Sequence, residues 1–328
     1  MPLFTALPSA IRYLLVWRIQ GRLVRLPPYL PVQISTTVAA LVAERLPTQQ
    51  AKPWQKAIAA AQQAAAGGEP ATAAWPIESV IFVPPGKRTY GEGEPIVWEL
   101  KLLGAHADHG LFLEVLLPAI EAAGVTRDPR WFSNYSLWGR FVVQAVYVAN
   151  GAEWQPLAEE GRLNLRLRPT TSQWANRLWS SAEPALKPRR LRWITPFALP
   201  LAETTVPPNP SDSAVTASAA QPPALTDLVA ALLSRLAQLQ TGRRALNSGA
   251  WGWLEAQERD ALQALLADAP AVSQHTLAAP PAGWPGRWIG DQRWAAPIPA
   301  PLLPYLDLAA ILHIGDHTHY GCGTFRLS

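Results

Sequence analysis

The sequence has little cysteine, little charge and no long apolar run. A single cysteine, Cys322, excludes an intramolecular disulfide and a cysteine-based zinc site. No stretch of about 18 apolar residues is uninterrupted, so we expect no transmembrane helix and no membrane partner. The N-terminal residues lack the basic start and the small-residue cleavage site of a signal peptide. Together these absences favour a cytoplasmic protein.

Charged residues make up only 16% of the chain, against roughly 25% in an average soluble protein. The chain nevertheless has 49% hydrophobic residues and 15 tryptophans. This composition excludes wholesale disorder, because a disordered chain is charged and poor in aromatic residues. The 328 residues suffice for about two domains of ordinary size.

Basic residues gather in one stretch, residues 161–193, which contains only one acid, Glu183. Its eight basic residues are Arg162, Arg166, Arg168, Arg177, Lys187, Arg189, Arg190 and Arg192. Three tryptophans, Trp174, Trp179 and Trp193, are interleaved with them. Such a pattern suits single-stranded nucleic acid, because arginine pairs with phosphates and bases stack on aromatic rings. The alternative is a solvated charged face with its tryptophans in the core.

Hydrophobic periodicity over residues 10–150 predicts the order β-α-β-β-α-β. The expected strands are Ile11–Arg25, Ile77–Val83, Ile96–Leu103 and Phe141–Ala149. The expected helices are residues 36–46, capped by Ser35 or Thr36, and Gly110–Ala123, capped by Asp108 and stopped by Gly124. Residues 57–74 are of low complexity and read as a loose helix or a loop. This order is the ferredoxin-like, or RNA-recognition-motif-like (RRM-like), plan.

A second pass of the same plan follows in the C-terminal half. Its expected elements are the strands Leu191–Leu199, Arg287–Pro297 and Gly321–Leu327, the helices Leu225–Leu239 and Leu302–Leu312, and a partly helical stretch Leu246–Ala279. We therefore predict an α+β protein with two tandem ferredoxin-like domains. Residues 1–150 form the first, residues 151–187 a basic connecting segment, and residues 188–328 an RNA-binding second domain with a flexible insertion at 202–224.

A glycine-rich segment lies between the last expected helix and the last strand. Gly315, Gly321 and Gly323 fall within His313–Leu327. Glycine there permits positive φ and close approach of another backbone. Successive free N–H groups in such a loop make an anion-binding nest.

This segment resembles the end of a known family, the CRISPR RNA-processing endoribonucleases of the RAMP superfamily (the Cas-six type). Pro84–Gly104 resembles the middle of the family's first domain, and Leu191–Pro196 resembles the strand that opens its second. Gln292–Arg293 and then Leu302–Gly315 resemble its approach to the glycine loop. The matches touch both halves of the chain in the right order.

The resemblance implies an antiviral-defence enzyme that binds the repeat of a CRISPR precursor RNA and cuts it once, with no metal and no cofactor. A general base takes the proton of the ribose 2′-OH, which attacks the adjacent phosphate. A general acid protonates the leaving 5′-oxygen, so the products are a 2′,3′-cyclic phosphate and a 5′-hydroxyl. Other subunits of a CRISPR effector complex are the further partners that it implies.

One departure from the family concerns the catalytic histidine. Members often carry it on or near the first helix, but this chain has no histidine before His106. We predict that the first and third strands are parallel neighbours, so that both helices start at one edge of the sheet. His106 and His109, at the start of the second helix, then become the candidate bases, since a helix N-terminus attracts phosphate. The alternatives are two exposed loop histidines, or an RNA-binding subunit that does not cut.

The remaining candidates lie near the C-terminus and in the basic stretch. His317 is a candidate for catalysis and for RNA contact. The other expected RNA-binding residues are Gly315, His319, Tyr320, Gly321, Gly323, Arg326, Arg189, Arg190 and Arg192. His313, His317 and His319 with Asp316 also admit a metal hydrolase, but no further ligand can be named, and we expect no metal site.

Overall fold

A computed structural model of the chain describes residues 7–67, 72–159, 161–176, 187–199, 221–241 and 250–328. The chain divides into two compact units. The first consists of residues 1–181, 282–285 and 317–321, and the second of residues 182–281, 286–316 and 322–328. Among the described residues, no helix combines the length and the hydropathy that a membrane crossing requires.

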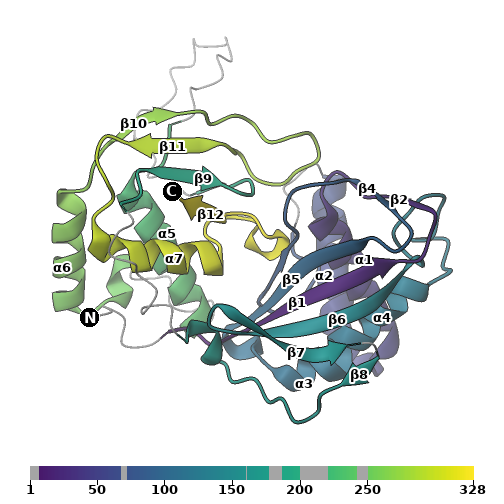
Figure 1. The fold of residues 1–328 in the computed structure, drawn as a ribbon. Coiled ribbons are helices and arrows are strands. Elements are labelled where there is room, and N and C mark those ends of the chain that lie inside the picture. Colours follow the sequence, from purple (N-terminus) through teal and green to yellow (C-terminus); the bar gives the residue numbers. More distant parts are fainter. Residues whose placement is uncertain (1–6, 68–71, 160, 177–186, 200–220, 242–249) are drawn as a thin grey trace. The chain divides into compact units, whose positions relative to one another are not determined.

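The first unit is built on a six-stranded antiparallel sheet with the order β3-β5-β1-β6-β7-β8 (Figure 1). Its strands are β1 (Ala10–Ile19), β3 (Ser79–Phe82), β5 (Pro95–Leu103), β6 (Phe141–Asn150), β7 (Glu153–Glu159) and β8 (Arg162–Leu163). Its helices are α1 (Leu30–Arg45), α2 (Thr48–Ala66), α3 (His109–Leu111) and α4 (Leu117–Val125). A separate pair, β2 (Leu23–Arg25) and β4 (Thr89–Gly91), forms a small second sheet.

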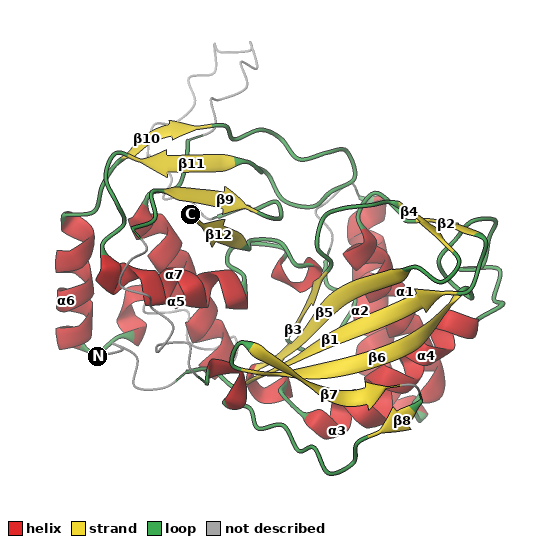
Figure 2. Ribbon diagram, in the orientation of Figure 1, coloured by secondary structure: helices red, strands yellow, loops and turns green. Residues whose placement is uncertain are grey.

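The core of this unit follows from the alternation that the sequence shows. Tyr13, Leu15 and Trp17 of β1 are fully buried, whereas Arg12 and Arg18 point to the other face. The buried side packs against the helices, which cover one face of the sheet in Figure 2. The strand predicted over Ile11–Arg25 was too long: it ends at Ile19, and Leu23–Arg25 pairs with β4 instead.

The first helix begins five residues before Ser35. Leu30 is its first residue and Pro31 occupies its first turn, where proline costs nothing because that N–H has no helical partner. The prediction that Ser35 or Thr36 caps this helix was therefore wrong. Ser35 is buried inside α1, and its hydroxyl is used elsewhere. Residues 57–66 of the low-complexity stretch, for which we expected a loose helix or a loop, belong to the helix α2.

The second predicted helix starts where the sequence indicates. Asp108 is its N-cap and accepts hydrogen bonds from the N–H groups of Gly110 (2.7 Å) and Leu111 (3.4 Å). The helix then widens into a π-helical turn over Phe112–Leu116 before α4. Pro118, in the first turn of α4, has no N–H to continue the α-helical ladder, which accounts for this turn.

The strand directions correct the geometric argument about the histidines. β1 and β5 are neighbours, as we predicted, but they run antiparallel, with Ala10 opposite Leu103 and Arg18 opposite Pro95. The first helix follows the Ile19 end of β1, whereas the second follows the Leu103 end of β5. The two helices therefore start at opposite edges of the sheet, and His106 and His109 do not lie at the edge where α1 begins.

The second unit has a four-stranded antiparallel sheet with the order β10-β11-β9-β12 (Figure 1). Its strands are β9 (Arg190–Trp193), β10 (Val272–His275), β11 (Asp291–Trp294) and β12 (Phe325–Leu327). Its helices are α5 (Leu225–Thr241), α6 (Ala256–Ala267) and α7 (Leu303–Leu312). With α6 set aside, the element order β9-α5-β10-β11-α7-β12 repeats the β-α-β-β-α-β order of the first unit, from which β2, α2 and β4 are set aside in turn. The sheet order β10-β11-β9-β12 corresponds to the order β3-β5-β1-β6 of the first sheet.

The structure describes much of the expected connecting segment but little of the expected insertion. Of the expected connecting segment 151–187, residues 153–159 and 162–163 pair as β7 and β8 at the edge of the first sheet. Of the expected insertion 202–224, residues 202–220 lie outside the described residues. Arg177, Trp179 and Glu183 of the basic stretch lie outside them as well.

Candidate functional site

The segment His317–Gly321 belongs to the first unit, and His319 is its buried anchor. His319 Nε2 lies 2.8 Å from the hydroxyl of Ser35 on α1, and Nδ1 lies 3.1 Å from the hydroxyl of Ser79 on β3. Its ring also meets the edge of Trp75. Both ring nitrogens are therefore engaged within the protein, so that the His319 side chain holds the segment in position and is not presented to solvent.

Tyr320 and Gly321 complete this packing. Tyr320 Oη donates to the carbonyl of Thr72, and the Tyr320 carbonyl accepts from Tyr29 Oη at 2.8 Å. Burial raises the pKa of Tyr320 to about 12, so the phenol stays protonated at neutral pH. Gly321 has φ of 75°, and a Cβ there would come within 2.6 Å of the Ile81 carbonyl. Only glycine fits this close approach.

Gly321 and Gly323 do not contribute free N–H groups to the anion-binding nest that we expected. The N–H of Gly321 donates to the Thr318 carbonyl at 2.9 Å, and that of Gly323 to the Pro196 carbonyl at 2.8 Å. Gly315 and Gly323 also have positive φ, and a Cβ at either would collide with a backbone carbonyl. Tight backbone packing therefore explains the glycines, and the two engaged N–H groups are unavailable to an anion in this structure.

His106 lies at the same end of β3 as His319. It ends a 3₁₀ turn, Gly104–His106, that follows β5 directly. The N–H of Glu78, just before β3, donates to His106 Nδ1 at 3.2 Å, and the next residue, Ser79, contacts His319. The structure thus brings His106 and the 317–321 segment to consecutive residues of one strand start. Because Nδ1 accepts a hydrogen bond, the neutral ring carries its proton on Nε2.

His109 has a different environment. Its Nδ1 lies 3.0 Å from Tyr13 Oη, and Tyr13 stacks on Phe112. Burial, and secondarily the charge of Arg168, lower the pKa of His109 and outweigh the opposing charge of Asp108. The ring is therefore neutral at pH 7. Its Nε2 is buried and has no hydrogen-bond partner among the described residues, so no ring nitrogen of His109 is open to a substrate in this structure.

His317 is the remaining histidine of the predicted catalytic set. It is half-buried and adopts a left-handed conformation, with φ of 58°, just before the turn Thr318–Tyr320. In the part of the chain that the structure describes, no group of three or more histidine, cysteine or acidic residues has the spacing of a metal site. His313 bonds instead through Nδ1 to the Cys322 carbonyl, at 3.1 Å.

The predicted arginines lie in the second unit. Arg189, Arg190, Arg192 and Arg326 are all exposed. The tryptophans interleaved with the basic stretch do not accompany them: Trp174 and Trp193 are buried in the cores. Of the two alternatives left open by the sequence, the structure therefore supports core packing over base stacking for these two tryptophans.

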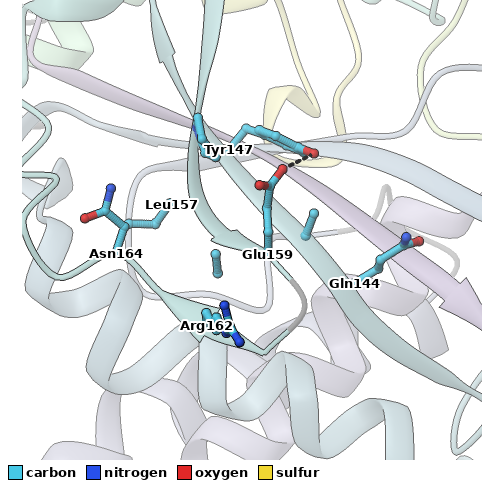
Figure 3. Close-up of a pocket in the computed structure, with 9 residues that line it drawn as sticks. Gln144, Tyr147, Leu157, Glu159, Arg162 and Asn164 are labelled. Atoms are coloured by element: carbon cyan, nitrogen blue, oxygen red, sulfur yellow. Dashed lines mark hydrogen bonds between the residues drawn. The ribbon is translucent and has the colours of Figure 1, made fainter.

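A hollow of about 530 Å³ lies on β6, β7 and β8 of the first unit (Figure 3). Tyr147 Oη donates to Glu159 across it at 2.8 Å, with buried Leu157 among the lining residues. This bond, with burial, raises the pKa of Tyr147. Arg162 and Asn164 of the stretch 161–193 line this hollow, and none of the predicted site residues is among its lining residues.

Sequence reasoning missed the partners of the histidines. Ser35 and Ser79 hold His319, Tyr13 holds His109, and Glu78 holds His106. Ser35 is 284 positions away from His319 in the sequence, and no local pattern connects them. Only the alternation of β1 offered a signal, since it placed Tyr13 on the buried face.

Neither a family model nor a curated protein matches the sequence. Solved structures do match. A chain of the partial Cas6-RT-Cas1–Cas2 complex aligns with 99% of this chain at 12% identity and a TM-score of 0.55, and a chain of the full Cas6-RT-Cas1–Cas2 complex aligns equally well. This chain spans 47% of the first and 29% of the second.

A Cas6 product complex aligns over 98% of this chain and 99% of its own, at 16% identity and a TM-score of 0.45. The two matches with the higher TM-score show the fold. Both cover nearly the whole chain, including the described elements of both units. The chain therefore has the fold of Cas6 structures, and the resemblance to the Cas-six type is confirmed at the level of the fold.

Proposed function

We propose that the protein is a metal-independent endoribonuclease that binds the repeat of a CRISPR precursor RNA and cuts it to give mature CRISPR RNA. In this proposal the chain has two tandem ferredoxin-like domains, residues 1–150 and 188–328, joined by residues 151–187. The shared β-α-β-β-α-β order and the shared strand order of the two sheets support the domain assignment. The Cas6 fold supports the activity by analogy. Support for the catalytic mechanism must come from the site residues, because a fold alone does not establish an activity.

One observation carries the catalytic proposal. His106 and the segment His317–Gly321 meet at Glu78 and Ser79, the start of β3. His106 and His317 are 211 positions apart in the sequence, yet both belong to segments that contact the start of β3. Both side chains are only half-buried. A phosphodiester cleaved by its own 2′-OH requires a proton acceptor and a group that neutralises the phosphate.

The three histidines take different roles in this proposal. The neutral ring of His106 presents Nε2–H and donates a hydrogen bond to a non-bridging oxygen of the scissile phosphate. His317 takes the proton of the 2′-OH as the oxygen attacks phosphorus and the bond between phosphorus and the 5′-oxygen breaks. The leaving 5′-oxygen takes a proton from water, and His317 gives its proton back to the solvent. His109 is a positioning residue, because Tyr13 holds its Nδ1 and its Nε2 is buried.

Binding is assigned to the remaining predicted residues. Arg189, Arg190, Arg192 and Arg326 pair with RNA phosphates. Gly315, Gly321 and Gly323 give the loop its close packing, and His319 and Tyr320 fix the position of His317 beside the RNA. Further CRISPR subunits are proposed as protein partners, because two matched structures are Cas6-RT-Cas1–Cas2 complexes.

The test scores binding and cutting separately, in EDTA, for His106→Ala and His317→Asn. Asparagine tolerates the left-handed backbone of position 317, so this variant removes the ring and little else. We expect cutting of the repeat RNA to fall by about 100-fold or more, and affinity to change by less than about threefold. Gln62→Ala, at an exposed position of α2, is the matched control and keeps full cutting. Undiminished cutting by both site variants would refute the catalytic assignment.

A second candidate function is a non-catalytic RNA-binding subunit with the same fold. The observation that favours it is that His109 has no accessible ring nitrogen and that no histidine precedes His106. Under this function the wild-type protein binds repeat RNA tightly and leaves it intact. His106→Ala and His317→Asn then have nothing to abolish, and only affinity responds to substitution.

A further inference from the structure

The sheet of the second unit presents arginines along one face. On β9, Leu191 and Trp193 are buried, so Arg190 and Arg192 point to the opposite, exposed face. Residues directly opposite one another in an antiparallel pair share a face. Arg293 of β11 lies opposite Arg190, and Arg326 of β12 lies opposite Arg192. Four arginines from three strands therefore share one exposed face, which we call the arginine face.

The charges of the arginine face are poorly compensated within the protein. Arg190 pairs with Asp291 at 3.2 Å, and Asp291 lies opposite Arg192. Within the described ranges, no ion pair involves Arg192, Arg293 or Arg326. Like charges directly opposite each other in a sheet destabilise it, and this face has two such pairs. A bound polyanion would neutralise this repulsion.

The shape and chemistry of the face indicate which polyanion. A hollow of about 470 Å³ opens at one end, lined among others by Arg189, Arg190, Gln274, His275 and Arg293. No tryptophan, tyrosine or phenylalanine lies among the residues that line it. The aromatic residues of these strands, Trp193, Trp294 and Phe325, belong to the buried side. The lining of the hollow therefore offers forked donors for phosphates, and the ring that it contributes is the imidazole of His275.

We propose that the arginine face, including Arg293, which is not among the RNA-binding residues expected from the sequence, binds the phosphate backbone of an RNA strand without reading its sequence. This deepens the RNA-binding part of the proposed function and is independent of cleavage. The strand lies across β12, β9 and β11, with one end of it in the hollow. Arg192, Arg293 and Arg326 each pair with phosphates, and Arg190 exchanges or shares its bond to Asp291.

The test is a triple variant, Arg192→Gln with Arg293→Gln and Arg326→Gln. Its control removes the same charge from exposed positions of the first unit: Arg22→Gln with Lys52→Gln and Lys56→Gln. Affinity is measured against salt concentration for repeat RNA and for an unrelated single-stranded RNA of equal length. Counterion release predicts that the slope of log affinity against log salt falls by about two in the triple variant. Affinity at about 0.1 M salt then drops roughly 100-fold for both RNAs.

Melting temperatures show that the variants are folded. Relief of the like-charge pairs predicts that the triple variant melts no lower than the control. Should it fail to fold, Arg326→Gln alone is used, with an expected slope change of about 0.7. A version with lysine at all three positions keeps the charge and retains most of the salt slope.

The outcomes separate this proposal from the proposed nuclease. A triple variant that loses no more affinity than the control overturns the arginine face, whatever the cleavage result. In a second outcome, the wild-type protein does not cut repeat RNA and binds it no more tightly than the unrelated RNA, while the triple variant loses affinity for both RNAs. This outcome supports the arginine face and rejects the proposed function. Loss of affinity for the repeat RNA alone contradicts sequence-independent binding.

Discussion

The two sheets have the same strand order but treat their charged residues in opposite ways. On the first sheet, Glu99 of β5 contacts Arg12 of β1 and Lys101 of its own strand, and all three are largely buried. On the second sheet, Arg192, Arg293 and Arg326 are exposed and have no such partner among the described residues. The two sheets thus share a strand order, but their charged residues differ in role. Those of the first sheet stabilise the fold, whereas those of the second are available to a ligand.

The difference shows in the electrostatics of Glu99. Burial by itself raises the pKa of this carboxyl, but the positive charges of Arg12 and Lys101 outweigh burial and hold the pKa below its usual range. The charge of Glu99 is therefore compensated within the protein by its two basic neighbours. The corresponding acid of the second sheet, Asp291, pairs with only one of the arginines, and the surplus positive charge remains on the surface.

The largest expected effect comes from Glu99→Gln. It leaves Arg12 and Lys101 buried without their counter-charge, so we expect the free energy of unfolding to fall by about 3–5 kcal/mol. Asp291→Asn is the matched variant in the second sheet, and its surface pair predicts a loss of no more than about 1 kcal/mol. Denaturant unfolding of both variants measures the contrast. If the two variants lost the same free energy of unfolding, the proposed difference in charge compensation between the two sheets would be contradicted.

The next effect concerns polar groups that hold the 317–321 segment. His319→Ala removes the bonds to Ser35 and Ser79 and leaves a gap beside Trp75, so we expect a loss of about 2–4 kcal/mol. His317→Asn, in the same segment, should cost no more than about 1 kcal/mol. A pair of urea titrations compares them. Comparable stability of the two variants would mean that His319 does not anchor the segment.

A smaller effect is the pH dependence from His109. Its pKa is lowered in the folded protein, so the unfolded chain binds a proton more readily as pH falls below about 6.5. The stability from the neutral ring is complete above that pH and is lost progressively below it. We expect the fall in melting temperature between pH 7.5 and pH 5.5 to be smaller in His109→Gln than in the wild type. His275→Gln, an exposed control, keeps the wild-type fall; an identical fall in all three proteins would contradict the assignment.

The smallest change in stability is expected for Arg326→Gln. This exposed side chain makes no ion pair within the described residues, so the free energy of unfolding should change by less than about 0.5 kcal/mol. Its affinity for RNA at about 0.1 M salt should nevertheless fall roughly fivefold, as expected for one lost phosphate contact. Fluorescence anisotropy with a labelled RNA provides the measurement. A variant that is destabilised but binds normally would reverse the proposed role.

The sequence predicted those features of the fold that depend on local chemistry. The alternation of β1, the Asp108 cap and the helix at Leu303–Leu312 follow from neighbouring residues, and all are present. The direction of β1 relative to β5 does not follow from either strand alone, and the prediction that they are parallel was wrong. The antiparallel direction results from the path of the chain through α1 and the β3–β5 connection.

The site was predictable only in part, for a related reason. Glycine spacing indicated a tightly packed loop, and glycines at 315, 321 and 323 do adopt positive φ. Whether their N–H groups are free depends on carbonyls that lie elsewhere, such as that of Pro196, which takes the N–H of Gly323. The burial of His319 likewise depends on Ser35 and Ser79, which no spacing rule connects to it.

The most direct test of the proposed function is incubation of the purified wild-type protein with end-labelled repeat RNA in EDTA. We expect one cut within the repeat, leaving a 2′,3′-cyclic phosphate on one product and a 5′-hydroxyl on the other. Tight binding without a cut would replace the nuclease with the RNA-binding subunit. Absence of both binding and cutting would contradict the proposed role of the arginines and histidines alike.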